Sequence, residues 1–267
     1  MPPVIILIMQ LSYVREGSGT PLVLIHGLGS AATAWRTITA DLAKEFDVIA
    51  FDLPGHGQTK FRDSIPMDPH SLAELVISNL DSLGITNFDL VGNSLGGWIA
   101  FEIAATYPER VKSVTALAPA GLWPHPFTKI NKRTTLIHYL AVLTVPLQPF
   151  LLRNNWSKGI AFGRTSPRWV SLPFEVCLDA AQAMGRSPGY FPAWEATLNH
   201  RFESPVDPRI PVTVIFGDSD NTLPAATCQA RDLAPAHSKW VIFKQTGHAP
   251  MWDEPGLVVD LIRATAK

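Results

Sequence analysis

Short apolar runs that alternate with helical segments are the feature of this 267-residue sequence that most constrains its fold. Apolar runs bounded by turn residues predict buried strands at 22–26, 47–52, 87–91, 111–118, 210–216 and 239–243. Helical periodicity predicts helices at 32–46, 70–83, 225–233 and 255–266, and a further helix directly after residue 97. This order is typical of a doubly wound sheet covered on both faces. We therefore expect an α/β fold with a mostly parallel sheet.

The alternation stops between residues 121 and 205, where proline and aromatic residues are frequent. A chain of this length is typically one domain, or one domain with a large insertion. We therefore expect an α/β core made of residues 1–120 and 206–267, and a mainly helical insertion made of residues 121–205. Most aromatic side chains of this insertion are expected to form its own core.

Charge and cysteine content exclude several classes of protein. The formal net charge is −1, which gives no electrostatic reason to bind nucleic acid. Cys177 and Cys228 lie far apart in the sequence and lack the spacing of a metal site, so they predict neither a disulfide framework nor a bound metal. The cytoplasm is therefore the expected location, with export as the alternative.

The N-terminal run Val4–Met9 is apolar but only six residues long. A membrane span needs roughly 20 apolar residues. No basic segment and no small-residue cleavage site of a signal peptide precedes Gln10. We expect an extra strand or an extension there, and no stable membrane insertion. Met9 is an alternative start of the chain.

Ser94 lies in Gly92–Gly96, a G-x-S-x-G sequence between a predicted strand and a predicted helix. A serine on such a sharp turn projects its hydroxyl at the end of the sheet, and the helix that follows points its positive N-terminal end at it. The glycines allow the strand and the helix to approach closely. The alternative is a serine that only caps the helix.

Other reactive groups also follow strand ends, where open α/β sheets bind their ligands. Asp218 and Asp220 come after the strand at 210–216, and His248 comes after the last strand. Histidine is the usual base at neutral pH, one carboxylate can orient it, and the other can cap a turn. The residue pattern alone does not say which aspartate does which. The glycines of His26–Ser30 either free backbone N–H groups for an oxyanion or form an ordinary turn.

Four motifs in this order resemble those of the α/β-hydrolase superfamily, in its cap-bearing serine esterase/lipase branch. They are His26–Gly29, Asp52–Gly57, Gly92–Gly96, and Gly217–Asp220 with Gly247–His248. The resemblance covers residues 11–118 and 210–266. It implies the hydrolase fold, with the insertion as a cap or lid whose own sequence resembles nothing specific.

The resemblance also implies a role for each reactive side chain. Ser94 is the nucleophile, His248 is the base, and Asp220 is the acid that orients the base. Asp218 is the second choice for that acid. No carboxylate follows the strand at 111–118, where some relatives keep their acid, and this favours Asp220.

Backbone groups and buried histidines complete the implied site. The backbone N–H groups of Leu28 and Leu95 are expected to hold the oxyanion. His26 and His56 resemble structural members of their motifs and are not expected to be catalytic. Such a site needs no metal ion and no organic cofactor.

The expected activity is hydrolysis of a small-molecule carboxylic ester through an acyl-enzyme, by a monomer or a homodimer. Two alternatives use the same site: hydrolysis of a carbon–carbon bond in a diketone formed by aromatic ring cleavage, and cofactor-free perhydrolysis. Carbon–carbon hydrolysis needs a pocket for a carboxylate, and the candidate arginines for it are Arg133, Arg153, Arg164, Arg168, Arg186 and Arg201. The non-enzymatic alternative is a small-molecule receptor.

The insertion is basic and rich in aromatic residues. It carries nine Lys/Arg and four Asp/Glu, a net charge of +5, which leaves −6 for the rest of the chain. A basic insertion can favour anionic substrates or an anionic lipid surface, but we interpret this one as a solvated outer face. The aromatic residues suggest an apolar pocket, and the candidates for lining it are Trp123, Met251 and Trp252.

Overall fold

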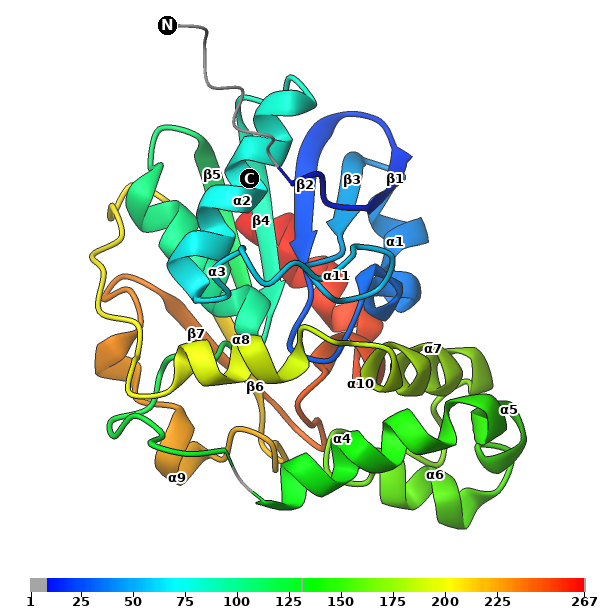
Figure 1. The fold of residues 1–267 in the computed structure, drawn as a ribbon. Helices are drawn as coiled ribbons and strands as arrows, with labels where there is room; N and C mark the ends of the chain where they lie inside the picture. Colours follow the sequence, from blue (N-terminus) through cyan, green and yellow to red (C-terminus); the bar gives the residue numbers. More distant parts are fainter. Residues whose placement is uncertain (1–8, 131, 267) are drawn as a thin grey trace, which may run out of the picture.

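The computed structural model describes residues 9–130 and 132–266, so the expected N-terminal strand or extension at Val4–Met9 lies outside them except for its last residue. The centre of the molecule is a seven-stranded sheet in the order β1-β3-β2-β4-β5-β6-β7, in which β1 (Tyr13–Gly17) is an edge strand (Figure 1). The parallel strands are β2 (Thr20–Ile25), β3 (Phe46–Phe51), β4 (Phe88–Asn93), β5 (Val111–Leu117), β6 (Val212–Gly217) and β7 (Lys239–Phe243). The mostly parallel sheet of the predicted α/β fold is confirmed.

Helices cover both faces of this sheet, which explains why its parallel strands are apolar along most of their length. The main ones are α1 (Arg36–Leu42), α2 (Pro69–Ser82), α3 (Leu95–Thr106) and α11 (Pro255–Thr265). The side chains of neighbouring residues in a strand point to opposite faces of the sheet. Val23 lies in the apolar cluster under α2 and α3, and Leu24 lies in the cluster under α1 and α11.

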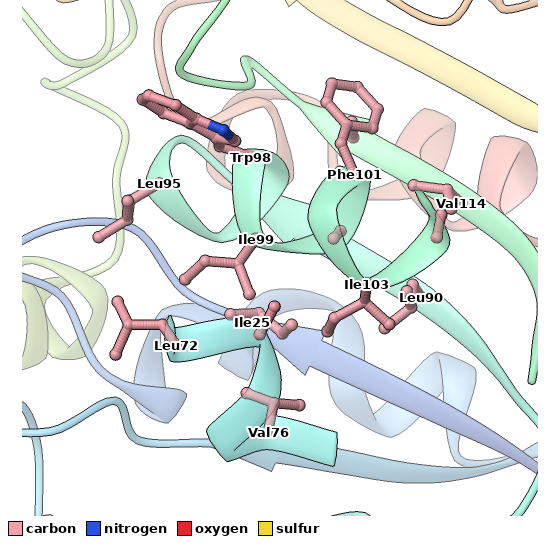
Figure 2. Packing of buried hydrophobic residues seen from close by; sticks show 14 of the residues in the cluster. Ile25, Leu72, Val76, Leu90, Leu95, Trp98, Ile99, Phe101, Ile103 and Val114 are labelled. Carbon is pink, nitrogen blue, oxygen red and sulfur yellow. The ribbon is translucent and has the colours of Figure 1, made fainter. Parts of the chain in front are cut away.

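The cluster under α2 and α3 is the larger of the two (Figure 2). Ile99 and Ile103 of α3 and Leu72 of α2 gather there around Ile25 of β2, and all four side chains are fully buried. Because these contacts come from helix and strand together, they fix the position of α3 relative to the sheet.

The helix predicted at 32–46 is shorter in the structure. A 3-10 turn, η1 (Ala32–Trp35), comes first, and α1 then ends at Leu42. The backbone N–H of Glu45 donates to the carbonyl of Leu42 at 3.0 Å in a turn that reverses the chain. Phe46, predicted to be helical, is therefore the first residue of β3.

The helix predicted at 225–233 is divided in the structure. Its parts are α9 (Ala225–Cys228) and the 3-10 turn η3 (Arg231–Leu233). Between them the backbone N–H of Ala230 donates to the carbonyl of Leu122 at 2.9 Å. This contact with a distant part of the chain replaces the hydrogen bond that would have continued the helix.

Two elements were not predicted. The strand β1 (Tyr13–Gly17) pairs antiparallel with β3 at the edge of the sheet, and each of its residues is exposed. It is held by backbone bonds and by the Arg15–Asp47 ion pair at 2.6 Å, so it has no apolar run to reveal it. The short helix α10 (Pro250–Asp253) directly follows the loop that carries His248.

The helices and turns within residues 121–205, the predicted insertion, leave it mainly helical in the structure. Its elements are α4 (Lys132–Thr144), the 3-10 turn η2 (Val145–Leu147), α5 (Gln148–Leu151), α6 (Asn155–Phe162), α7 (Phe174–Gly185) and α8 (Tyr190–Thr197). In Figure 1, α4, α5 and α6 lie at the bottom, away from the sheet. A small apolar cluster of its own joins Leu152, Phe162, Leu172 and Cys177.

The start of α3 lies directly against the backbone of β2 because Gly96 has no side chain. A Cβ atom on Gly96 would lie 1.9 Å from the carbonyl oxygen of Ile25, and one on Gly92 would lie 2.1 Å from the carbonyl oxygen of Gly96. Neither distance leaves room for a carbon atom. The glycines of the G-x-S-x-G sequence therefore allow the close approach of strand and helix that the sequence predicts.

Replacing Gly96 by alanine should destabilise the fold by about 3 kcal/mol or more, since backbone on both sides must move. Urea unfolding of the two proteins measures this difference. The matched control is Gly256→Ala in α11, where an added Cβ meets nothing within 4 Å. That variant should be neutral or stabilised by up to about 1 kcal/mol. Equal free energies of unfolding for the two variants would contradict this account of the turn.

Candidate active site

Ser94 lies between β4 and α3 in an uncommon backbone conformation, with φ 54° and ψ −117°. Residues other than glycine rarely adopt a positive φ, and such positions cluster at functional sites. The backbone groups of Ser94 itself are bonded: its N–H donates to the carbonyl of Leu117 at 3.0 Å, and its carbonyl accepts from Ala120 at 2.9 Å. The residues on either side are buried, whereas Ser94 is partly exposed. The turn thus holds one hydroxyl residue in a fixed position.

His248 and Asp220 form a buried pair on the loops that follow β7 and β6. The Nδ1 atom of His248 lies 2.8 Å from Oδ2 of Asp220. The other carboxylate oxygen accepts the backbone N–H groups of Thr222 and Leu223, each at 2.8 Å. Since the carboxylate can only accept, Nδ1 carries the proton and Nε2 is left free to take one.

The structure separates the two aspartates that the residue pattern could not. Asp218 is exposed, and its carboxylate accepts the hydroxyl of the adjacent Ser219 at 2.9 Å. Asp220 is the residue that contacts His248. The first choice for the orienting acid is therefore the aspartate that the fold brings to the histidine.

Asn93 links the turn at Ser94 to the loop of His248, a connection that the sequence analysis missed. Its side-chain amide donates to the carbonyl of His248 at 3.1 Å and to the carbonyl of Leu117 at 3.0 Å. Asn93 is buried, so both bonds are sheltered from water. Its place directly before the serine was visible in the sequence, but nothing there indicated the partner.

Leu28 and Leu95 offer backbone N–H groups beside Ser94. In the described part of the chain, neither N–H donates to a backbone or side-chain acceptor. Leu95 is the first residue of α3, where N–H groups have no partner within the helix. The turn that carries Leu28 is adjacent, because a Cβ atom on Gly27 would lie 2.9 Å from the Cβ of Ser94. Both predicted oxyanion donors therefore flank the serine.

His26 is a structural part of the same turn, as the sequence suggested. Its Nε2 accepts the backbone N–H of Leu53 at 3.0 Å, and its Nδ1 donates to the carbonyl of Gly27 at 2.7 Å. Both ring nitrogens are thus used within the protein. Burial lowers the pKa of His26 to about 4, so the ring is neutral at pH 7.

Asp52 and His56 hold the neighbouring turn. The Asp52 carboxylate accepts the backbone N–H groups of Ala32 at 2.7 Å and Gln58 at 2.9 Å. His56 donates from Nδ1 to the carbonyl of Pro54 at 2.9 Å. Burial, and then the nearby His26 ring, lower the pKa of His56 to about 3.

The insertion contacts this site from two directions that the sequence did not reveal. The carbonyl of Thr165 accepts the backbone N–H of His248 at 2.7 Å. On the other side, a Cβ atom on Gly29 would lie 2.6 Å from the sulfur of Met184 and 2.9 Å from the ring of Tyr190. Met184 and Tyr190 therefore lie against the turn of Leu28, and they are candidates for enclosing a substrate.

A second carboxylate, Asp253, braces the histidine loop. It accepts the hydroxyl of Ser166 in the insertion, and the backbone N–H of Gly247 at 2.8 Å. Arg168 adds a bond to the carbonyl of Gln245 at 3.0 Å. Burial raises the pKa of Asp253. The loop is thus held by residues of the insertion as well as by the core.

The three residues predicted to line a pocket are packed into apolar surroundings. Trp123 contacts Trp98, with ring centroids 5.4 Å apart, and Met251 lies in the cluster under α1 and α11. Trp252 donates from its indole N–H to the carbonyl of Ala34 at 2.9 Å. Their role in lining a pocket remains a prediction.

In the described part of the chain, no group of three or more His, Cys, Asp or Glu side chains is placed to hold a metal ion. Two surface hollows lie away from Ser94. One, of about 480 Å³, is on α5 and α6, and the other, of about 540 Å³, lies between residues 202–208 and 232–237.

The chain matches the family model of the α/β-hydrolase fold over residues 20–255. It therefore belongs to the α/β-hydrolase fold family, as the motifs in the sequence suggested.

Its relatives are diverse. An uncharacterised protein of Mycobacterium tuberculosis is 28% identical, over 92% of this chain and 75% of the relative. A pimeloyl-acyl-carrier-protein methyl ester esterase of Aeromonas salmonicida is 26% identical, over 96% of this chain and 98% of the relative. A 2-hydroxymuconate semialdehyde hydrolase of a Pseudomonas species is 38% identical, but over only 40% of this chain and 39% of the relative.

Among solved structures, a bacterial membrane phospholipase A aligns over 96% of this chain and 81% of its own, at a TM-score of 0.72 and 25% identity. A putative lipase of Acinetobacter baumannii aligns over 95% of this chain and 86% of its own, at a TM-score of 0.73 and 22% identity. These likenesses support the α/β-hydrolase fold that the family match shows.

Acid should destabilise the fold through its buried histidines. The folded pKa values of His26 and His56, about 4 and about 3, lie below the ordinary 6.5. Between the folded and the unfolded pKa values the unfolded chain binds more protons, so the free energy of unfolding decreases as the pH is lowered, by about 1.4 kcal/mol per pH unit for each histidine. His56→Asn keeps a donor for the carbonyl of Pro54 and should make this slope shallower by one histidine's share.

Urea unfolding of both proteins between neutral pH and about pH 4 measures the two slopes. Comparing them removes the contribution of the buried carboxyls, which both proteins share. Parallel slopes would mean that His56 titrates normally in the folded chain.

Proposed function

We propose that this chain is a serine hydrolase that cleaves carboxylic esters through an acyl-enzyme. The observation that carries the proposal is the buried His248–Asp220 pair, which Asn93 ties to the strained turn at Ser94. A histidine oriented by a carboxylate, a hydroxyl residue held on a turn and unpaired backbone donors are the parts that acyl transfer requires.

In this mechanism Nε2 of His248 takes the hydroxyl proton of Ser94 as its Oγ attacks the acyl carbon. Nδ1 stays bonded to Asp220, which stabilises the imidazolium. The N–H groups of Leu28 and Leu95 hold the oxyanion, and one such donor typically lowers the barrier by about 3–4 kcal/mol. His248 then protonates the leaving alcohol. In the second half of the reaction His248 takes a proton from a water molecule, which attacks the acyl-enzyme, and the proton returns to Ser94 as the acid is released.

An ester is the favoured substrate because the similarity to the methyl ester esterase covers nearly the whole of both chains. Carbon–carbon bond hydrolysis is the second candidate, favoured by the shorter match to the 2-hydroxymuconate semialdehyde hydrolase. The insertion's arginines weigh against it. Those with described side chains are either exposed (Arg153, Arg164, Arg186) or bonded to a carboxylate (Arg168, Arg201), so they leave no buried cation for a substrate carboxylate.

Ser94→Ala should fold normally and lose turnover of p-nitrophenyl esters by about a thousandfold or more, because the nucleophile is gone. Steady-state kinetics measure the loss, and thermal unfolding controls for the fold. A fluorophosphonate probe should label the parent protein and not this variant. Parent-like turnover by the variant would rule out Ser94 as the nucleophile, and an unlabelled parent protein would favour a receptor over an enzyme.

The two aspartates provide a matched pair of variants. Asp220→Asn keeps the shape of the side chain but removes the charge that orients His248, and should lower kcat by a factor on the order of 10³–10⁴. Asp218→Asn, on the same loop but exposed, should leave kcat within about twofold. A comparable loss in both variants would place the orienting acid elsewhere.

A further inference from the structure

The outer side of the insertion exposes large apolar side chains. Leu136, Leu140, Leu143, Leu147 and Phe150 follow one another at helical spacing along α4, η2 and α5, and Trp156 adds to them from α6. Leu143 is 74% exposed, and Phe150 and Trp156 are each 76% exposed. We call these six residues the apolar face. Soluble monomers rarely leave so many large apolar groups together in water, so this face indicates a partner.

The surrounding stretch is unusual for the surface of a folded protein. Residues Thr134–Leu151 are long and apolar enough to cross a membrane by length and composition, with a mean hydropathy of 1.3, yet only 11% of them are buried. A core helix of the same composition would be mostly buried. A single stretch of this kind is weak evidence for a membrane span. The side of this stretch opposite the apolar face is attached to the rest of the protein.

Two buried side chains make that attachment. Gln148 donates to the carbonyls of Ala141, on α4, and Ala181, on α7, at 3.0 and 3.2 Å. The ring of His138 stacks on that of Tyr190, with centroids 4.3 Å apart. The stretch can therefore lie on an apolar surface with its exposed side while its other side stays in the fold.

Charge decides which apolar partner fits. Between residues 121 and 174 the chain has seven Lys/Arg and no Asp/Glu. Lys129, Lys132 and Arg153 are exposed and form no ion pair among the described residues. A second copy of this face would bring the same positive charges into contact, which disfavours a dimer. An anionic surface would neutralise them.

The apolar face also has a recess suited to a lipid. The hollow of about 480 Å³ is lined by Phe150, Leu151, Arg153, Asn154, Trp156 and Ser157. It combines aromatic walls with a guanidinium and an amide. Tryptophan and arginine of this kind favour the boundary between headgroups and acyl chains.

We propose that the apolar face docks on the surface of a bilayer that contains anionic lipids. Leu143, Phe150 and Trp156 enter the headgroup boundary, and the exposed cations contact the lipid phosphates. The solvated outer face expected from the sequence is replaced by this interpretation. Docking would place the proposed hydrolysis at a membrane surface. The proposal of docking does not depend on that activity.

Flotation with vesicles tests the proposal, and the full chain carrying Ser94→Ala is used so that no lipid is hydrolysed. It should float with vesicles of phosphatidylcholine mixed with phosphatidylglycerol, and less with phosphatidylcholine alone. The combined variant Leu143→Ser, Phe150→Ser, Trp156→Ser should lower the bound-to-free ratio by more than about tenfold. Replacing Lys129, Lys132 and Arg153 by glutamine should remove the preference for phosphatidylglycerol.

The matched control is Val14→Ser, Ile242→Ser, Leu257→Ser, which removes exposed apolar residues of the core and should leave binding unchanged. Thermal unfolding of each variant checks the fold. The proposal is overturned if the parent chain ignores both kinds of vesicle or if the apolar-face variant binds as well as the control. It is also overturned if sedimentation shows a dimer that only the apolar-face variant loses, since a second copy then covers the face.

Discussion

The close contact between α3 and the sheet is the constraint on which the rest of the site depends. Gly96 lets the helix begin against the backbone of Ile25, and the chain enters that helix through Ser94 at a positive φ. Such a conformation typically costs about 1–3 kcal/mol in a residue other than glycine. It persists because β4 on one side and the apolar cluster beneath α3 on the other fix both ends of the turn. The strain is therefore a product of packing, and it holds the hydroxyl at the edge of the sheet.

The base reaches this edge because β6 and β7 run parallel to β4, so that their carboxyl ends meet there. Three different parts of the chain then hold His248. Asp220 binds its ring, Asn93 binds its carbonyl from the turn at Ser94, and Thr165 of the insertion binds its N–H. Main-chain bonds on both sides of the ring leave it little freedom. A change in the insertion near residue 165 therefore reaches the base directly, although no side chain of the insertion needs to touch the ring.

The sequence predicts best those features that depend on local pattern, and worst those that depend on distant partners. The parallel strands were predictable because burial on both faces makes them apolar, whereas β1 is exposed and was missed. The choice of Asp220 over Asp218 as the orienting acid needed the resemblance, because the contact with the histidine is made only in the fold. Most aromatic residues of the insertion were expected to form its own core. That holds for Phe162, which lies in the insertion's own cluster, but Trp123 packs into the cluster of the α/β core, and Phe150 and Trp156 are exposed. A periodicity of apolar residues marks a side of a helix, but it does not reveal whether protein, water or lipid lies against it.

The insertion has an inner side, where Met184 and Tyr190 lie against the turn of Leu28, and an outer side, where the apolar face lies. The two sides are joined by α7, whose end carries Met184 and whose middle is bonded to Gln148. Transmission of a signal from one side to the other would require α7 to have two positions. The buried bonds of Gln148 and the apolar cluster around Cys177 hold it in one. A surface bound to the apolar face would therefore orient the site and leave its geometry unchanged. An ester that partitions into such a surface is then concentrated near Ser94 by location alone.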